Sequence, residues 1–263
     1  MLLNILYQWP TYVDIIIFII LMVVCMRWGY SLKRKKIRKD PSFKPEEGSA
    51  IEGALLGLLA LLLAFTFSMA SERFEERRKV VIEEANNIAS AIRNADLYPD
   101  SIKNEFRNYL KQYIEARIDY FEARRNQEKV ASALKETRRL QEKLYTIVIG
   151  DARDKQVLTR AQLMVPVLQE LDENVTVREN LRLATVPILV YVLLLILCFT
   201  ASFMVGYKQP AKKLDGIMTW IFILMTSMAV YLIEDLDRPR SGLITNHQAN
   251  QAIFELRNLF TIP

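Results

Sequence analysis

Charged side chains near the C-terminal end form the densest group in the sequence that could bind or move ions. The group contains Glu234, Asp235, Asp237, Arg238 and Arg240. Rings of such side chains at the mouth of a pore bind cations or act as gates. Local ion pairs at the end of a helix would also account for the group. Both readings stay open, and Asp235, Asp237 and Arg238 are kept as a candidate ion pathway or gate.

Two isolated carboxylates, Asp14 and Glu52, lie near the ends of apolar stretches. Ionisable residues inside membrane spans often mark ion pathways. At the end of a span, the same side chains can instead extend into the polar membrane interface. Glu52 therefore joins the candidate ion pathway, with an interfacial position as the alternative.

A line of small residues follows Glu52 along the same apolar stretch: Gly53, Gly57, Ala60, Ala64 and Ser68. Their spacing of three and four residues places them on one side of a helix. Small residues let two helices approach closely in a membrane. The line predicts either packing within one chain, or else a helix interface between subunits or a pore lining.

Patterns for catalysis or cofactor binding are missing from the sequence. His247 is the only histidine, so one chain cannot build a histidine-based triad or metal site. No glycine-rich phosphate loop follows a strand pattern, and the other carboxylates lie on charged helical faces. We therefore expect no catalytic residues, no metal, no cofactor and no enzymatic activity.

Four apolar blocks have the composition of membrane-spanning helices. They cover about residues 13–26 (extendable to 12–30), 51–70, 186–205 and 214–233. Positive charge follows the first block instead of preceding it, and no small-residue cleavage site appears. The first block is therefore a retained span and not a signal peptide.

The second block continues into a charged, helix-prone segment that lacks glycine and proline before Pro99. We expect one helix over residues 51–97, about 70 Å long at 1.5 Å per residue. Segments 102–123, 130–148 and 157–175 repeat the same alternation of apolar residues at spacings of three and four. These seams predict a coiled-coil-like bundle that is continuous with the second and third spans.

Breaks between the helical segments fall at turn-forming residues. Pro99 ends the first segment, and Asp100 or Ser101 is the expected N-cap of the next. Residues 124–128 form a turn or a kink, and Gly150 with Asp151 ends the third helix. Proline at position 166 should kink the fourth helix or mark a restart.

These elements predict an all-α protein with four transmembrane helices. A long-helix extramembrane domain, similar to a four-helix bundle, is inserted between the second and third spans. The expected parts are the first two spans with their basic connector (1–70), the helical extramembrane domain (71–183), the third and fourth spans (184–233), and a C-terminal motif with an amphipathic helix (234–263).

Basic residues concentrate between Arg27 and Lys44 and recur at Lys208, Lys212 and Lys213. By the positive-inside rule, short basic connectors stay in the cytoplasm. The rule therefore predicts both termini and the helical domain on the periplasmic side of the bacterial inner membrane. A lipid-headgroup or nucleic-acid site is the alternative for the first connector. The four spans make the lipid bilayer the expected partner, and the near balance of charge in residues 71–183 favours no nucleic acid.

Two stretches carry a resemblance to a known family. Gly57–Ala70, followed by Glu72-Arg73-x-x-x-x-Arg78 and Glu84-Ala85, resembles the start of the bacterial bestrophin-like membrane proteins of unknown function. Asp235-Leu-Asp-Arg-Pro-Arg-Ser-Gly242 is similar to that family's C-terminal signature. The resemblance implies kinship with bestrophins, which form pentameric anion channels through the second span and keep their helical domain in the cytoplasm. It implies a homo-oligomer, five subunits by analogy, and ions as partners.

Two functions follow from these patterns. The leading one is an oligomeric inner-membrane protein, with ion conduction as its candidate activity and the second span nearest the symmetry axis. The alternative is a non-conducting sensor or scaffold that signals through its extramembrane helical bundle. A channel needs a pore-facing stripe in an assembled ring, whereas a sensor needs a packed protomer and a partner.

Overall fold

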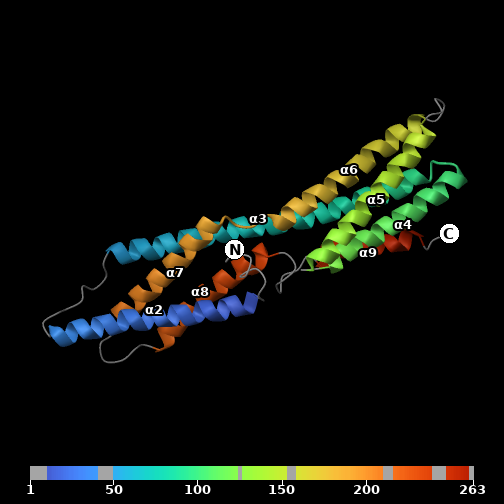
Figure 1. Ribbon diagram of the computed structural model, residues 1–263. Coiled ribbons are helices and arrows are strands. Elements are labelled where there is room, and N and C mark those ends of the chain that lie inside the picture. Colours follow the sequence, from blue (N-terminus) through green and yellow to red (C-terminus); the bar gives the residue numbers. More distant parts are fainter. Residues whose placement is uncertain are drawn as a thin grey trace. The chain divides into compact units, whose positions relative to one another are not determined.

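The computed structural model describes residues 11–40, 50–123, 126–152, 158–209, 216–238 and 247–260. Every regular element within these ranges is a helix, which confirms the all-α prediction (Figure 1). The helices are α2 (Thr11–Lys39), α3 (Ala50–Ala95), α4 (Asp100–Glu122), α5 (Gln127–Asp151), α6 (Leu158–Leu183), α7 (Ile188–Lys208), α8 (Gly216–Asp237), α9 (His247–Glu255) and the 3₁₀ helix η2 (Leu256–Phe260).

Four stretches of helix are long and apolar enough to cross a membrane, which confirms the four predicted spans. They include α2, the N-terminal part of α3, α7 and α8. The chain divides into two compact units. Unit 1 comprises Met1–Arg73 and Thr185–Arg238, and unit 2 comprises Phe74–Ala184 and Pro239–Pro263.

Helices α2 and α7 of unit 1 pack closely through two glycines. A Cβ atom added at Gly29 would collide with the α7 backbone, and one added at Gly206 would collide with the carbonyl of Met26. The Ser202 hydroxyl donates a hydrogen bond to the carbonyl oxygen of Met22, at 2.7 Å. Such close backbone contact supplies the dispersion energy that joins helices in lipid, where the hydrophobic effect gives no help.

One end of unit 1 brings together the two connectors that the sequence marks as basic. The Lys33 ammonium donates hydrogen bonds to the carbonyl oxygens of Lys208 (3.3 Å) and Gln209 (2.7 Å). Lys208 also forms an ion pair with Glu52, near the start of α3. The C-terminal ends of α2 and α7 therefore meet the N-terminal end of α3. Three other lysines of the two connectors, Lys44, Lys212 and Lys213, lie outside the described residues.

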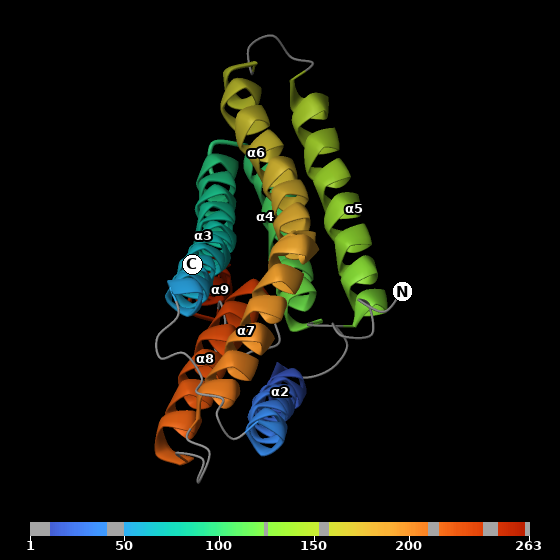
Figure 2. The same ribbon diagram turned by 90° about the vertical axis from the view of Figure 1, so that its left-hand side faces the viewer.

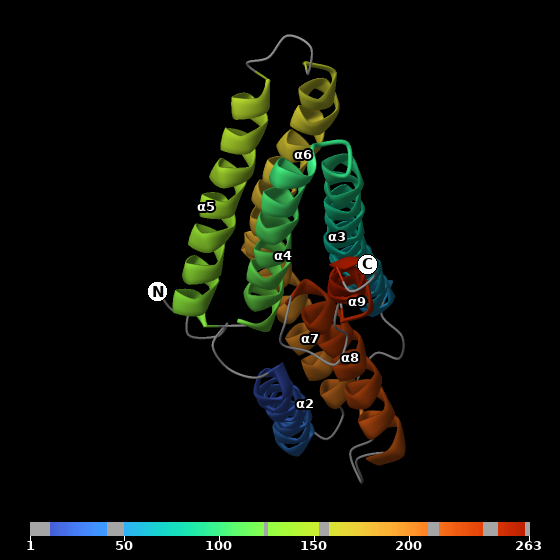
Figure 3. The same cartoon turned by 90° about the vertical axis from the view of Figure 1, so that its right-hand side faces the viewer.

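Unit 2 is built on a four-helix arrangement of the second part of α3 with α4, α5 and α6. In Figures 2 and 3, α3 and α5 lie at opposite edges of this unit, with α4 and α6 between them. The seam residues predicted from the sequence fill its core, and the fully buried ones include Ile88, Phe106, Leu144 and Leu171. The C-terminal helix α9 packs on the same core through Ala249 and Ile253.

Several boundaries differ from the predicted ones. The bundle is not continuous with the third span, because residues 184–187, which end in Pro187, separate α6 from α7. Proline cannot donate the backbone hydrogen bond that would continue the helix. Pro166 neither ends nor restarts α6, which runs through it. The N-cap of α4 is Pro99, without a side-chain hydrogen bond, and Asp100 is its first residue.

Candidate functional site

An arginine at the C-terminal end of α8 binds two carboxylates from different helices. Arg238 forms an ion pair with Glu234, one helical turn earlier, and with Asp14 of α2 at 2.7 Å. The three side chains are at most 10% exposed. Charges removed from water are costly unless they are paired. The arginine therefore ties the N-terminal end of α2 to the C-terminal end of α8.

Asp237, a carboxylate of the predicted ion pathway, is also bound within unit 1. It accepts hydrogen bonds from the backbone N–H of Val186 at 2.9 and 3.2 Å. This contact satisfies a backbone donor in the break before α7. Asp235 is likewise buried, at 1% exposure. We refer to Asp14, Glu234, Asp237 and Arg238 together as the acid–arginine cluster.

A cavity of ≈ 450 Å³ between α2, α7 and α8 has the acid–arginine cluster in its wall. The remainder of the lining is largely apolar and includes Phe18 and Phe199, whose ring centroids are 5.5 Å apart. An apolar cavity with a few charged groups is typical of sites that bind an amphiphilic or hydrophobic molecule. The role of Asp235, Asp237 and Arg238 as ion pathway or gate stays a prediction.

The structure separates Glu52 from the rest of the predicted ion pathway. Its partner is Lys208, and the two belong to the end of unit 1 where α2 and α7 finish, whereas the acid–arginine cluster lies where α2 begins and α8 finishes. Arg240, together with Pro239, Ser241 and Gly242 of the C-terminal signature, lies outside the described residues.

The small-residue line on α3 is exposed along its whole length. Gly53, Gly57, Ala60, Ala64 and Ser68 are all exposed, and a Cβ atom added at either glycine meets nothing within 4 Å in the described part of the chain.

The buried face of the same span carries Leu59, Thr66 and Ala70. At 100° per residue, this face lies nearly opposite the small-residue line. The described chain therefore leaves the line free for another molecule. The subunit interface and the pore lining both stay predictions for this line.

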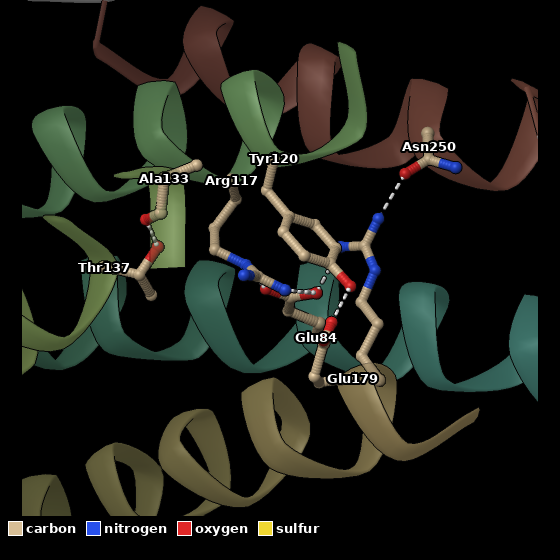
Figure 4. A network of polar contacts seen from close by, with 8 residues as sticks. Glu84, Arg117, Tyr120, Ala133, Thr137, Glu179 and Asn250 are labelled. Carbon is tan, nitrogen blue, oxygen red and sulfur yellow. Dashed lines mark hydrogen bonds and ion pairs between the residues drawn. The ribbon is translucent and has the colours of Figure 1, made fainter. Parts of the chain in front are cut away.

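Unit 2 contains a buried ionic network that the sequence analysis missed. The Glu84 carboxylate, fully buried, accepts hydrogen bonds from both Arg117 of α4 and Arg178 of α6, the latter at 2.5 Å (Figure 4). Arg178 also donates to the amide oxygen of Asn250 in α9, at 2.5 Å. In the same view, the Tyr120 hydroxyl donates a hydrogen bond to the carboxylate of Glu179 in α6, at 2.8 Å. The network thus connects α3, α4, α6 and α9.

Opposing effects set the pKa of the Glu84 carboxyl. Burial raises it, but the positive charges and hydrogen bonds of Arg117 and Arg178 outweigh burial and hold the pKa below its ordinary value. Burial raises the pKa of the neighbouring Tyr113 phenol, and the Glu84 charge adds to this effect. Glu84 therefore stays ionised and Tyr113 stays neutral at neutral pH.

The missed network has a signal in the sequence. Glu84 lies three residues after Val81 and four before Ile88, which are both core positions of the α3 seam. Arg117 lies four residues after Tyr113, also in the core. A charged residue at an apolar position of a helix repeat must be buried with a partner of opposite charge, because an unpaired buried charge is strongly destabilising.

The fold and the two sites define a helical, four-span membrane protein with a second, helical unit. A family model for the Bestrophin-like domain matches residues 53–245. The chain therefore belongs to the bestrophin-like family. A comparison with curated protein sequences gives no match.

Solved structures of a bacterial Bestrophin homolog from Klebsiella pneumoniae share this fold. One variant has a TM-score of 0.70 at 18% sequence identity, covering 95% of this chain and 97% of that one. A second structure of the homolog has a TM-score of 0.69 at 17% identity, covering 94% and 97%. A further variant has 0.67 at 16%, covering 94% and 99%. At this identity the likeness establishes the fold alone.

Proposed function

We propose that this chain is one subunit of a homo-oligomeric, bestrophin-like ion channel in the bacterial inner membrane. The second span, in α3, lines or borders the symmetry axis, and five subunits form the ring by analogy with bestrophins. The chain has no enzymatic role in this proposal. The helical domain faces the periplasm, because the two basic connectors belong on the cytoplasmic side.

The observation that carries the proposal is the exposed small-residue line on α3. A span with one buried face and a second face of glycine, alanine and serine is suited to close contact with another helix or to an aqueous path. Membership of the bestrophin-like family supports the same reading.

The first prediction concerns Gly57→Leu. The new side chain would hold α3 away from its neighbour in the ring, so we expect the oligomer to dissociate or distort and conductance in planar bilayers to disappear. Unit 2 should stay folded, because it lacks the substituted residue. Native mass spectrometry and bilayer recording measure the two effects.

Gly216→Leu is the matched control. A Cβ atom at Gly216 also meets nothing within 4 Å of the described residues, but Gly216 begins α8. We expect this variant to keep wild-type mass and conductance. If the Gly57→Leu protein keeps the wild-type oligomer mass, this face of α3 is not part of the subunit interface.

The alternative, a non-conducting sensor or scaffold, draws support from α3 itself. This 46-residue helix contributes to both units without interruption, so a movement of its span could be passed to the bundle. A wild-type ring that passes no ion at any voltage or salt concentration tried would favour this function over the channel.

A further inference from the structure

A polar groove of ≈ 510 Å³ runs between α3 and α6 in unit 2. Glu83 of α3 and Glu170 and Glu173 of α6 line it, and all three are exposed. Glu83 has a loose partner in Lys79 at 3.8 Å, a kind of surface pair that contributes little. Neither α6 glutamate forms an ion pair with another described residue. The groove is therefore left with unbalanced negative charge.

An amide in the groove wall also lacks a partner. Asn174 lines the groove at 8% exposure, and its Nδ2 has no hydrogen-bond partner within the described ranges. Leaving a buried donor unsatisfied costs free energy. Positive charge from an occupant would balance the glutamates, whereas the amide N–H needs a hydrogen-bond acceptor.

The outer face of α5 has the complementary charge. Lys135, Arg138 and Arg139 are exposed there, and Arg139 is already bound to Glu136 at 2.6 Å. Lys135 and Arg138 have no ion pair among the described side chains. Lys135 and Arg138 are thus two cations that can pair with the two α6 glutamates, on a face of α5 that also carries the exposed Glu142 one turn after Arg138.

The two surfaces lie at the same height along the bundle. The Tyr120 hydroxyl donates a hydrogen bond to Glu179 of α6 at 2.8 Å, and Tyr120 belongs to the same small buried cluster as Val130 of α5, so these residues lie at about one level. Helices α5 and α6 are antiparallel neighbours. From that level, the free cations of α5 and the free glutamates of α6 both lie about 8–14 Å along the bundle, at 1.5 Å per residue.

Rotation about an axis parallel to the bundle does not change the height of a residue. Complementary surfaces at equal height on different sides of a subunit can therefore meet at every interface of a closed ring. Figures 2 and 3 show that α3 and α5 lie at opposite edges of unit 2, so one subunit can present its groove and its basic face to two different neighbours.

We infer that unit 2 binds a second copy of this chain head-to-tail, with Lys135 and Arg138 of one subunit in the Glu170–Glu173 groove of the next. The inference rests on the proposed homo-oligomer and names the surfaces that join its extramembrane units.

Disulfide cross-linking tests the contact directly. In a background with Cys25→Ala and Cys198→Ala, a chain with Glu173→Cys is co-expressed with a differently tagged chain with Arg138→Cys. We expect an oxidised heterodimer that neither chain forms alone. Arg93→Cys, an exposed α3 position outside the groove, replaces Arg138→Cys in the control and should give no such product. A ring whose paired cysteines do not cross-link overturns the inference.

Charge reversal provides the second test. Glu170→Lys with Glu173→Lys should shift the detergent-solubilised oligomer to monomer mass, and adding Lys135→Glu with Arg138→Glu should restore it. Restoration also shows that the reversed chains fold. An oligomer that survives the first reversal overturns the inference and leaves the channel proposal intact. A wild-type chain that is monomeric in detergent and in bilayers overturns both.

Discussion

Glu84 shows how one buried carboxylate can hold several helices together. It is fully buried in α3, and its two guanidinium partners come from α4 and α6. Arg117 also lies over the Tyr120 ring, 4.6 Å from the ring centroid. Removing one member of such a network leaves the others buried without a counter-charge, which is more damaging than never having buried them.

Glu84→Gln should therefore destabilise unit 2 strongly. Loss of the charge leaves two buried guanidiniums unpaired, and breaking a buried pair costs about 3–5 kcal/mol. Chemical unfolding followed by circular dichroism measures the change. Glu136→Gln is the control, since its pair with Arg139 is about half exposed and should contribute about 0–1 kcal/mol.

The same substitution should change how stability depends on pH. The folded-state pKa of Glu84 lies below the ordinary value of 4.5, so its stabilisation is complete above that pH. It is lost as the pH falls through the folded-state value. The wild-type protein should lose stability on acidification below about pH 4.5, and Glu84→Gln should lose less over this range. Parallel losses in the two proteins would contradict the assignment.

Among the elements, α2 and α7 form the closest helix pair described here, and glycines make it possible. Gly206→Ala places a methyl group against the carbonyl of Met26. Overpacking of this kind costs about 1–3 kcal/mol. We expect a lower thermal unfolding temperature in detergent, while Gly216→Ala, at an uncrowded glycine of α8, should have little effect. Equal temperatures for the two variants would show that the helices can separate without cost.

The helices themselves were predictable, because apolar runs and the 3.5-residue period depend on local sequence. Their partners were not. Gly29, Gly206, Gly53 and Gly57 are all glycines in apolar helical stretches. Of these four, only Gly29 and Gly206 pack against another helix in the described part of the chain. The sequence groups Asp14 with Glu52 because both are carboxylates near the ends of spans. In the structure Asp14 instead forms an ion pair with Arg238, which is far away in the sequence. Spacing along one helix carries no information on which helix lies beside it.

At the scale of the whole molecule, the two basic connectors bear on the orientation of the protein in the membrane. The hydrogen bonds from Lys33 to the end of α7 place both basic connectors at the same end of unit 1. This agrees with a common location for the two connectors.

Cysteine labelling in intact cells should find the α4–α5 turn on the periplasmic side. Asn126 is the obvious position, but its side chain caps α5 by accepting a hydrogen bond from the Lys129 backbone N–H, at 3.0 Å. Gln127→Cys, exposed and next to the cap, is the better variant. We expect labelling by a membrane-impermeant maleimide without lysis. Labelling that requires lysis would place unit 2 in the cytoplasm.

The close pairing of α2 with α7 also has a consequence for biogenesis. The Ser202–Met22 hydrogen bond joins residues 180 positions apart in the chain. At 5–20 residues per second, a ribosome needs roughly 9–36 s to make the partner after the first span has emerged. Throughout that interval the glycine face of α2 meets only lipid, the insertion machinery or a chaperone. A nascent chain that stops before α7 should therefore expose an unpaired first span to membrane quality control.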